Sequence, residues 1–167
     1  MKCPIKKQGE LSEKKPSLHE VINRLLVSYQ PVAVNQRSFF VNDVPEGITV
    51  ETDINTLTTL LGSLFYLTGR LCRDTCIKIS AKAYHDVVLM HIKDTSTYNS
   101  YAILSELNHL QLLGGKIGGY VELTSRRKKE TTIAFSFINR PEQYHLAESV
   151  QIKNIKRETD ELDSLRA

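Results

Sequence analysis

The sequence has little that would suit a membrane-spanning, secreted or metal-binding protein. It contains no run of about 18 apolar residues, so we expect no membrane span, and the lysine-rich N-terminus lacks the apolar core of a secretory signal. The cysteines are only Cys3, Cys72 and Cys76, an odd and sparse set that suits a reducing cytoplasm better than a disulfide scaffold. Cys72 and Cys76 have no nearby Cys/His pair at zinc-site spacing. We therefore expect a cytoplasmic protein without a metal.

An excess of charge of one sign is also missing. Lys and Arg total 22 against 19 Asp and Glu, which gives a net charge of +3. The longest basic run, residues 126–129, falls between two expected strands and is typical of a solvated hairpin turn. Nucleic acid is not an expected partner, because domains that bind it usually carry a strongly basic face. Hydrophobic residues make up 41% of the 167 residues, enough for one domain with a sizeable core.

Apolar periodicity and turn residues predict helices that alternate with pairs of strands. Ser17 and Glu20 form a capping box ahead of a first helix, and Pro31 is expected to end or kink that helix. Asp53 caps a second helix, which is apolar on more than one side and is therefore expected to be deeply buried. The remaining expected elements are strands over 38–44 and 48–50, a hairpin of 75–84 with 86–94, a helix over 98–113, and a hairpin of 120–126 with 131–138.

These elements predict an α/β fold of the α+β sandwich type. The sheet is expected to be mixed and mostly antiparallel, with three helices on one face. The core domain is expected over residues 17–141. Residues 1–16 are predicted to form a mobile leader, and residues 142–167 a polar tail that is either a weak helix or disordered.

The helix that opens at Asp53 resembles the buried helix of the ATPase domain of sensor histidine kinases. In that family an Asp-x-x-x-Leu-x-x-x-Leu run leads into an Asn-Leu-Leu-x-Asn-Ala-x-Lys segment. Here Asp53, Leu57 and Leu61 match the opening, and Ser-Leu-Phe-Tyr-Leu-Thr-Gly-Arg at 63–70 occupies the rest. The family shares a Bergerat-type fold with gyrases, mismatch-repair proteins and heat-shock chaperones, the GHKL superfamily.

Two later motifs extend this resemblance in the same order. The family's central hairpin ends in Asp-x-Gly-x-Gly, and residues 94–98 here read Asp-Thr-Ser-Thr-Tyr. The family's last hairpin reads Gly-Gly-x-Ile-x-x-x-Ser and then Gly-x-Gly-Thr. Residues 118–125 read Gly-Gly-Tyr-Val-Glu-Leu-Thr-Ser, and residues 128–131 read Lys-Lys-Glu-Thr. This last stretch fixes the register over about twenty residues and is the most specific match.

The resemblance implies a vestigial nucleotide site at five positions. Asp94 stands where the family accepts a hydrogen bond from the adenine amino group, and Thr131 where a threonine assists it. Ser63 replaces the first asparagine of the helix motif, and Arg70 matches the basic position that can meet a phosphate. Ser96 occupies a glycine position after the aspartate. No catalytic residue and no metal ligand is expected.

Departures from the family pattern predict that phosphate binding is lost. Leu67 replaces the asparagine that ligates Mg²⁺, a cation that requires oxygen ligands. Ser96 and Tyr98 replace glycines that allow close approach to adenine. Only residues 95–102 are left for the lid, and Glu106, near the expected lid glycines, would repel a phosphate. We expect no cofactor and no Mg²⁺, while Asp94 leaves weak ATP or ADP binding open.

His19 lies in a sequence that imitates the phospho-acceptor box of histidine kinases. His19, Glu20 and Asn23 reproduce the pattern His-Glu-x-x-Asn. That box would need a second dimerisation helix before the ATPase domain, whereas a strand is expected from Ser38. We therefore interpret His19 as an ordinary residue of the first helix.

The leading hypothesis is a degenerate histidine-kinase-like domain that binds or scaffolds a protein partner in signalling, without kinase activity. The alternatives are a retained ATP-binding domain of a histidine or anti-sigma-type protein kinase, and an adaptor for a response regulator or phosphotransfer protein. The sequence leaves open whether the protein is a monomer or a homodimer.

The two ends are predicted not to contribute to the core. Their apolar residues are too sparse to offset the entropy of ordering, about 1–2 kcal/mol per residue. Deleting residues 1–16 or 142–167 should therefore leave the melting temperature nearly unchanged in scanning calorimetry. A drop of many degrees would show that the deleted segment packs onto the domain.

Overall fold

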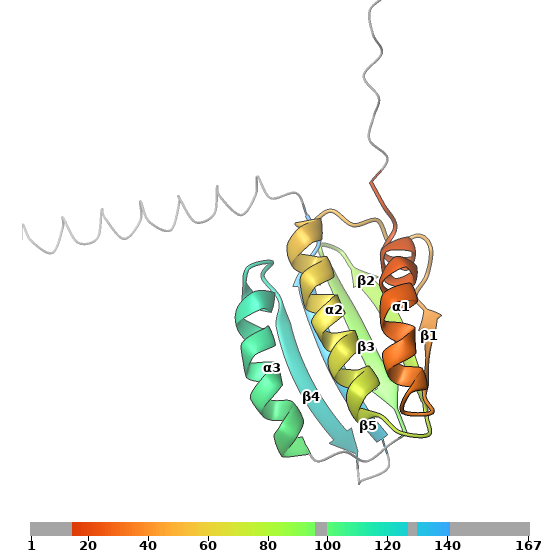
Figure 1. The fold of residues 1–167 in the computed structure, drawn as a ribbon. Helices are drawn as coiled ribbons and strands as arrows, with labels where there is room; N and C mark the ends of the chain where they lie inside the picture. The colour runs from red at the N-terminus through yellow and green to blue at the C-terminus, as the bar shows by residue number, and fades with distance from the viewer. Residues whose placement is uncertain (1–14, 96–99, 127–129, 141–167) are drawn as a thin grey trace, which may run out of the picture.

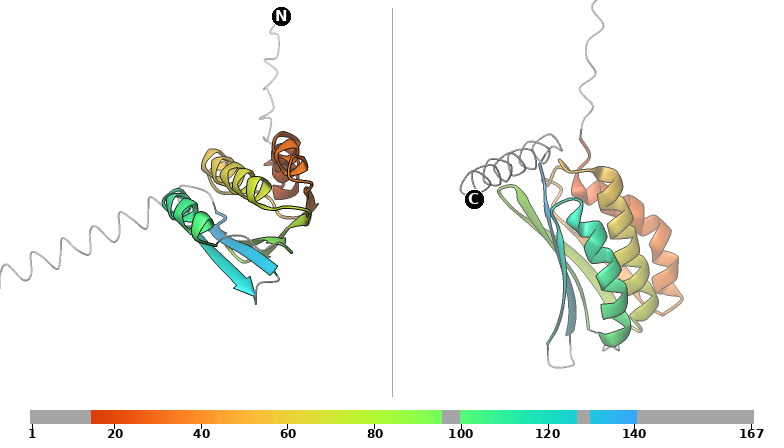
Figure 2. Two further views of the ribbon diagram at one scale, coloured as in Figure 1. Left: turned by 60° about the horizontal axis from the view of Figure 1, so that its bottom comes forward. Right: turned by 90° about the vertical axis from the view of Figure 1, so that its left-hand side faces the viewer.

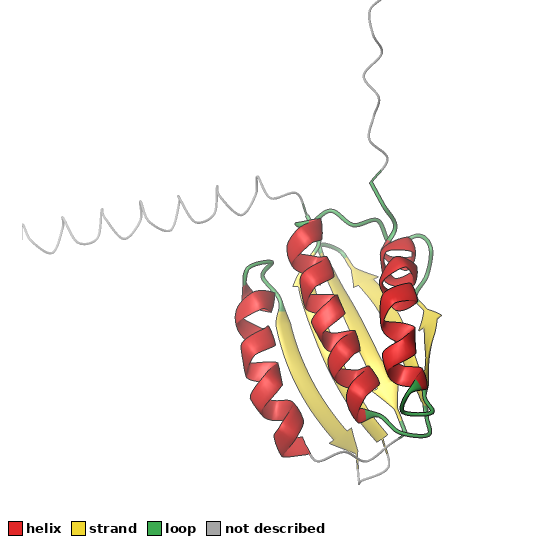
Figure 3. Cartoon of the chain, viewed as in Figure 1, coloured by secondary structure: helices red, strands yellow, loops and turns green. Residues whose placement is uncertain are grey.

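A computed structural model of the chain describes residues 15–95, 100–126 and 130–140 (Figure 1). Most of the predicted leader and tail lies outside these ranges, although Lys15 and Pro16 already contact Glu51 and Val50. The elements are α1 (Leu18–Val34), β1 (Phe39–Asp43), α2 (Ile54–Leu71), β2 (Cys76–Tyr84), β3 (Val87–Asp94), α3 (Ser100–Gly115), β4 (Tyr120–Arg126) and β5 (Glu130–Ile138). Figure 3 shows them as two layers, helices over strands.

The sheet has five strands in the order β1-β2-β3-β5-β4. β1 pairs in parallel with β2, and the other three pairs are antiparallel. All three helices cover the same face of this sheet (Figure 2). The predicted fold class and both predicted hairpins are therefore confirmed. Among the described residues, no helix is both long and apolar enough to cross a membrane.

The core lies between α2 and the covered face of the sheet. Every second residue of β2, β3 and β5 points to this face, as the two-residue repeat of a strand requires. The fully buried side chains on α2 and β2 are Leu57, Leu60, Leu61, Leu64, Phe65, Leu67, Ile77 and Ile79. The predicted deep burial of the second helix is therefore confirmed. Burial of one such side chain contributes about 1.5–3 kcal/mol to stability.

The expected strand over 48–50 does not form. Thr49 makes only an isolated bridge to Ser17, while the carbonyl of Ile48 accepts the N–H of Leu18 at 2.7 Å. The segment therefore pairs with the residues that lead into α1, and not with the edge of the sheet. Its backbone groups are satisfied there, which leaves five strands where six were expected.

Pro31 does not end α1, which was one of the two outcomes expected from the sequence. The helix continues to Val34 and is closed by Asn35, whose N–H donates to the Pro31 carbonyl at 3.1 Å. A proline removes the hydrogen bond to the residue four positions earlier, here Val27, which is exposed and can be satisfied by water. The last turn also buries Ala33 completely, so packing offsets the lost bond.

Asp53 caps α2 as the sequence predicted. Its carboxylate accepts the backbone N–H of Asn55 at 3.0 Å and of Thr56 at 3.1 Å, and it also accepts the Thr56 hydroxyl. The hydrogen bond from the Thr56 side chain, followed by the two backbone N–H groups, holds the pKa of Asp53 below its usual value of 3.8. The ionised carboxylate is thus the form that stabilises the helix start.

Replacing Asp53 with Ala should reduce the free energy of unfolding by about 1 kcal/mol at neutral pH. Because the folded pKa is depressed, this stabilisation is present above pH 3.8 and is lost as the pH falls through the folded value. Denaturant titrations at several pH values should therefore show that the difference in free energy of unfolding between D53A and the wild type becomes smaller towards pH 3. Asp53→Asn, a neutral cap, is the control. A difference between D53A and the wild type that stays constant with pH would contradict the role of the ionised Asp53 carboxylate as the cap of α2.

Candidate functional site

Asp94 and Thr131, predicted from separate motifs, lie side by side in the sheet. Asp94 ends β3 and its Cα partner on β5 is Thr131. Each is only 4% exposed. Asp94 falls in the alternation of the buried residues Met90 and Ile92, so its side chain belongs to the face that the helices cover. The strand register thus joins a buried carboxyl and a buried hydroxyl group.

A chain of hydroxyl groups fixes the backbone directly after Asp94. The Thr95 hydroxyl lies 2.9 Å from that of Thr75, and the Thr95 N–H donates to the same Thr75 oxygen at 3.3 Å. The Thr75 N–H donates to the Ser38 hydroxyl, which in turn donates to the Cys72 carbonyl. The end of β3 is therefore anchored to the loop that follows α2.

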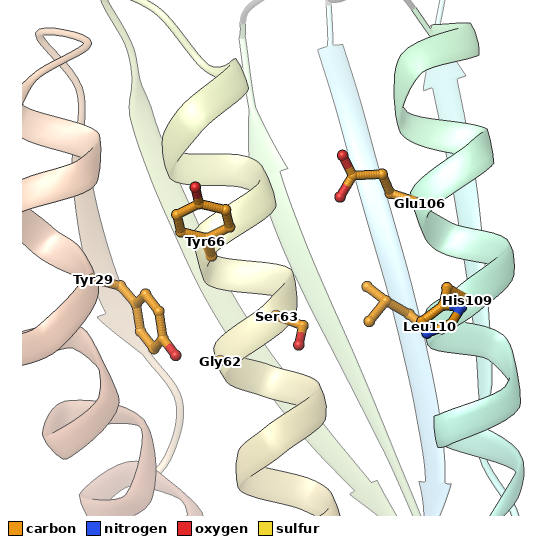
Figure 4. Close-up of a pocket in the computed structure, with 7 residues that line it drawn as sticks. All are labelled: Tyr29, Gly62, Ser63, Tyr66, Glu106, His109 and Leu110. Carbon is orange, nitrogen blue, oxygen red and sulfur yellow. The ribbon is translucent and has the colours of Figure 1, made fainter.

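Ser63 lies apart from this pair, on the outer side of the helical layer. Its hydroxyl donates to the Thr59 carbonyl at 2.9 Å. It lines a hollow of about 580 Å³, together with Tyr29, Gly62, Tyr66, Glu106, His109 and Leu110. Figure 4 shows α1, α2 and α3 each contributing side chains to this hollow. Asp94 and Thr131 do not line it, so the predicted residues form two separate groups.

Arg70 is held by a carboxylate at the rim of this hollow. Its guanidinium lies 2.7 Å from Glu106 on α3 and 5.8 Å from the ring centroid of Tyr66. Both side chains of the ion pair are about half exposed, so the pair contributes little to stability. Its chemical effect is larger, because the cation expected to meet a phosphate has an anionic partner, and Glu106 keeps a negative charge at that place.

Leu67 belongs to the hydrophobic core. It is 1% exposed and lies on α2, four residues from Ser63. The resemblance expects an asparagine here that ligates Mg²⁺, yet the leucine side chain offers no oxygen. Among the described residues, no three His, Cys, Asp or Glu side chains are grouped so that they could hold a metal ion.

The connection between β3 and α3 is short. β3 ends at Asp94 and α3 begins at Ser100, so residues 95–99 are the whole connection. The resemblance expects a lid at this place, long enough to wrap a phosphate with backbone N–H groups. Ser96 and Tyr98, two positions singled out in the sequence, lie outside the described residues.

His19 holds α1 against the end of β1. Its Nδ1 lies 2.6 Å from the Val44 carbonyl, and a carbonyl only accepts, so this nitrogen donates. The Asn42 amide donates to the His19 carbonyl at 3.1 Å and to the Asn23 side chain at 2.8 Å. All three contacts fasten α1 to the sheet, as expected for an ordinary residue of the first helix.

Sequence reasoning missed the aromatic side chains that border the large hollow. Tyr66 follows Ser63 by three positions, and this helical spacing was a usable signal for a shared face. Tyr29 lies on α1 beside Gly62, where a Cβ atom would come within 2.6 Å of the tyrosine oxygen. Such a contact between distant segments has no local signal.

Comparison with solved structures identifies the fold. The model matches the Acinetobacter baumannii histidine kinase AdeS with a TM-score of 0.65 at 12% identity, over 75% of this chain and 66% of that one. It matches the catalytic domain of histidine kinase ThkA with a TM-score of 0.64 at 17% identity, over 75% and 96%. ThkA in complex with the response regulator TrrA matches with a TM-score of 0.59 at 17% identity, over 75% and 41%.

No protein-family model matches the sequence, and no curated protein matches it either. The matches to solved structures nevertheless show that the chain has the fold of a histidine kinase catalytic domain. It covers 66% of the AdeS chain, and the likeness to these proteins extends to the fold of this one domain.

Introducing the family's two asparagines one at a time, at positions 63 and 67, should show that position 67 lies in the core and position 63 near the surface. Leu67→Asn removes a buried apolar group and buries a polar one, so we expect a loss of roughly 2–5 kcal/mol. Ser63→Asn, one turn away and half-buried, should change stability by no more than about 0.5 kcal/mol. Urea unfolding of both variants measures the difference. Equal tolerance at the two positions would show that Leu67 does not pack as described.

Proposed function

We propose that this domain is a degenerate member of the histidine-kinase-like ATPases and serves as a protein-binding module in signalling, without ATP hydrolysis or kinase activity. The observation that carries the proposal is the burial of Leu67 at the position where Mg²⁺ would need an oxygen ligand. Without that metal, the charge of a triphosphate has no counter-ion at this place.

Two further features support the loss of phosphate binding. Arg70 is paired with Glu106 at 2.7 Å, so a phosphate would have to displace one carboxylate and lie near its charge. The connection of residues 95–99 is too short for a lid that ends in a phosphate-binding turn. Each feature weakens binding to a triphosphate without affecting the fold.

A retained ATP-binding domain of a histidine or anti-sigma-type protein kinase is the second candidate. It is favoured by the buried pair of Asp94 and Thr131, which the strand register places together. A buried carboxylate accepts hydrogen bonds strongly. In the degenerate domain of the leading proposal, the same pair would leave only a weak adenine site that does not depend on the phosphates.

An adaptor function is the third candidate. ThkA, whose catalytic domain shares this fold, has been solved in complex with a response regulator. A domain that no longer transfers phosphate can keep a protein-binding surface. The partner class on this proposal is a response regulator or a phosphotransfer protein.

Calorimetry with ATP, ADP and adenosine, each with and without Mg²⁺, separates these candidates. We expect no Mg²⁺-dependent binding at micromolar concentrations, because two lost charge-assisted contacts of about 1.5–3 kcal/mol each weaken binding at least a hundredfold. Asp94→Ala should abolish any residual adenosine binding, whereas Asp43→Ala, at an exposed carboxylate, should leave it unchanged. Micromolar ATP affinity that requires Mg²⁺ and is lost in D94A would refute the degenerate interpretation.

A further inference from the structure

The two edges of the sheet are closed to different extents. At β1 the Phe39 N–H donates inward to the loop before β2, so the Phe40 N–H faces outward, where the side-chain oxygen of Gln30 accepts it at 3.1 Å. The Asn42 side chain accepts the Val44 N–H at 3.1 Å. The strand has only five residues. Short length and side-chain caps are two ways in which proteins blunt an edge strand.

The opposite edge, β4, is longer and less protected. It has seven residues, and the outward N–H of Val121 is accepted by the side-chain oxygen of Gln111 on α3 at 2.8 Å. Outward-facing residues alternate along an antiparallel strand, so the backbone of Leu123 also faces outward. Within the described part of the chain, no side chain caps the Leu123 backbone. Between these two outward-facing residues, only Val121 therefore has a side-chain cap.

A hollow of about 230 Å³ runs along this edge, between β4 and α3. It is lined by Leu107, Asn108, Gln111, Tyr120, Val121, Glu122 and Leu123. Leu107 and Val121 are buried apolar residues, and Asn108 and Gln111 add amide groups. Glu122 is exposed and, one position from Val121, points to the opposite face of the sheet. The edge thus offers a recess with both apolar and amide groups on one face and a carboxylate on the other.

We propose that the β4 edge binds an extended peptide segment of a protein partner, which adds to the sheet as a sixth, antiparallel strand. The segment places an apolar side chain in the hollow and a Lys or Arg opposite Glu122. Because Glu122 bonds inward, it would form a pair without hydrogen bonds to the new strand, and side chains are closest in such pairs. The inference deepens the proposed protein-binding function and rests on it.

A second copy of the chain does not fit this edge. α3 lies along the outer side of β4 in Figure 1. Two β4 strands would pair at about 4.7–4.9 Å, and their two α3 helices would then approach more closely than the 8–10 Å that helix packing needs. A single peptide strand carries no such helix.

Gln111 competes with this incoming strand. Its side-chain oxygen occupies the place that a backbone carbonyl of the peptide would take on the Val121 N–H. Binding requires that the glutamine turns away, so its removal should strengthen binding. A glutamine that merely contacted the peptide would have the opposite effect when removed.

The test uses the full chain labelled with ¹⁵N and a seven-residue peptide of alternating lysine and valine, titrated by NMR. We expect chemical-shift changes centred on the amides of Val121 and Leu123. Gln111→Ala should tighten binding by a few-fold, while Gln30→Ala, the matched change at the β1 edge, should leave it unchanged. Glu122→Lys should weaken binding roughly fivefold and favour a peptide of alternating glutamate and valine.

Leu123→Pro is a further variant, since proline removes only an outward N–H on an edge strand and should abolish binding. Shifts centred on another surface, no binding at millimolar peptide, or a Gln111→Ala variant that binds more weakly would overturn the proposal. These readouts are independent of the nucleotide calorimetry. The edge can fail while the degenerate interpretation stands, and tight Mg²⁺-dependent ATP binding can refute that interpretation without affecting the shifts on β4.

Discussion

The burial of α2 is the constraint on which the rest of the structure depends. This helix lies between α1 and α3 and against the sheet, so apolar side chains occupy most of its circumference and only a narrow stripe, which includes Thr59, Tyr66 and Arg70, is exposed. Gly62 and Gly69 allow α1 to approach closely, since a Cβ at Gly62 would press on Tyr29 and one at Gly69 would lie 3.4 Å from the Ala33 nitrogen. Any polar group needed away from that stripe would have to be buried, and burial without a partner is costly.

This constraint separates what the sequence could predict from what it could not. Three local patterns each predicted an element. They are the apolar residues on several sides of α2, its Asp53 cap, and the alternation in the four strands of the two hairpins. The continuation of α1 through Pro31 and the pairing of Thr49 with Ser17 depend on packing between distant segments. The Arg70–Glu106 pair joins residues 36 positions apart, and nothing local distinguishes it from two solvated charges.

The same distinction applies to the candidate site. Asp94 and Thr131 were expected at one site only from the resemblance, since they belong to different predicted hairpins, and the pairing of β3 with β5 brings them side by side. Ser63 and Arg70 matched the family by position, but their surroundings are set by α3, whose orientation the sequence did not define. A shared fold with AdeS and ThkA therefore fixes where these positions lie, and the side chains on them decide the chemistry.

The proposed loss of nucleotide chemistry and the proposed peptide-binding edge both depend on one feature, the position of α3. Where α3 faces α2, Glu106 reaches Arg70 and places a carboxylate at the rim of the groove. Where α3 faces β4, Gln111 reaches the edge strand and caps a single N–H. An ion pair across the groove resists an anionic ligand, whereas one neutral amide is a weak competitor for a strand that offers several backbone hydrogen bonds. On both proposals, α3 therefore acts twice: through Glu106 it opposes a phosphate, and through Gln111 it is only a weak competitor for a protein segment.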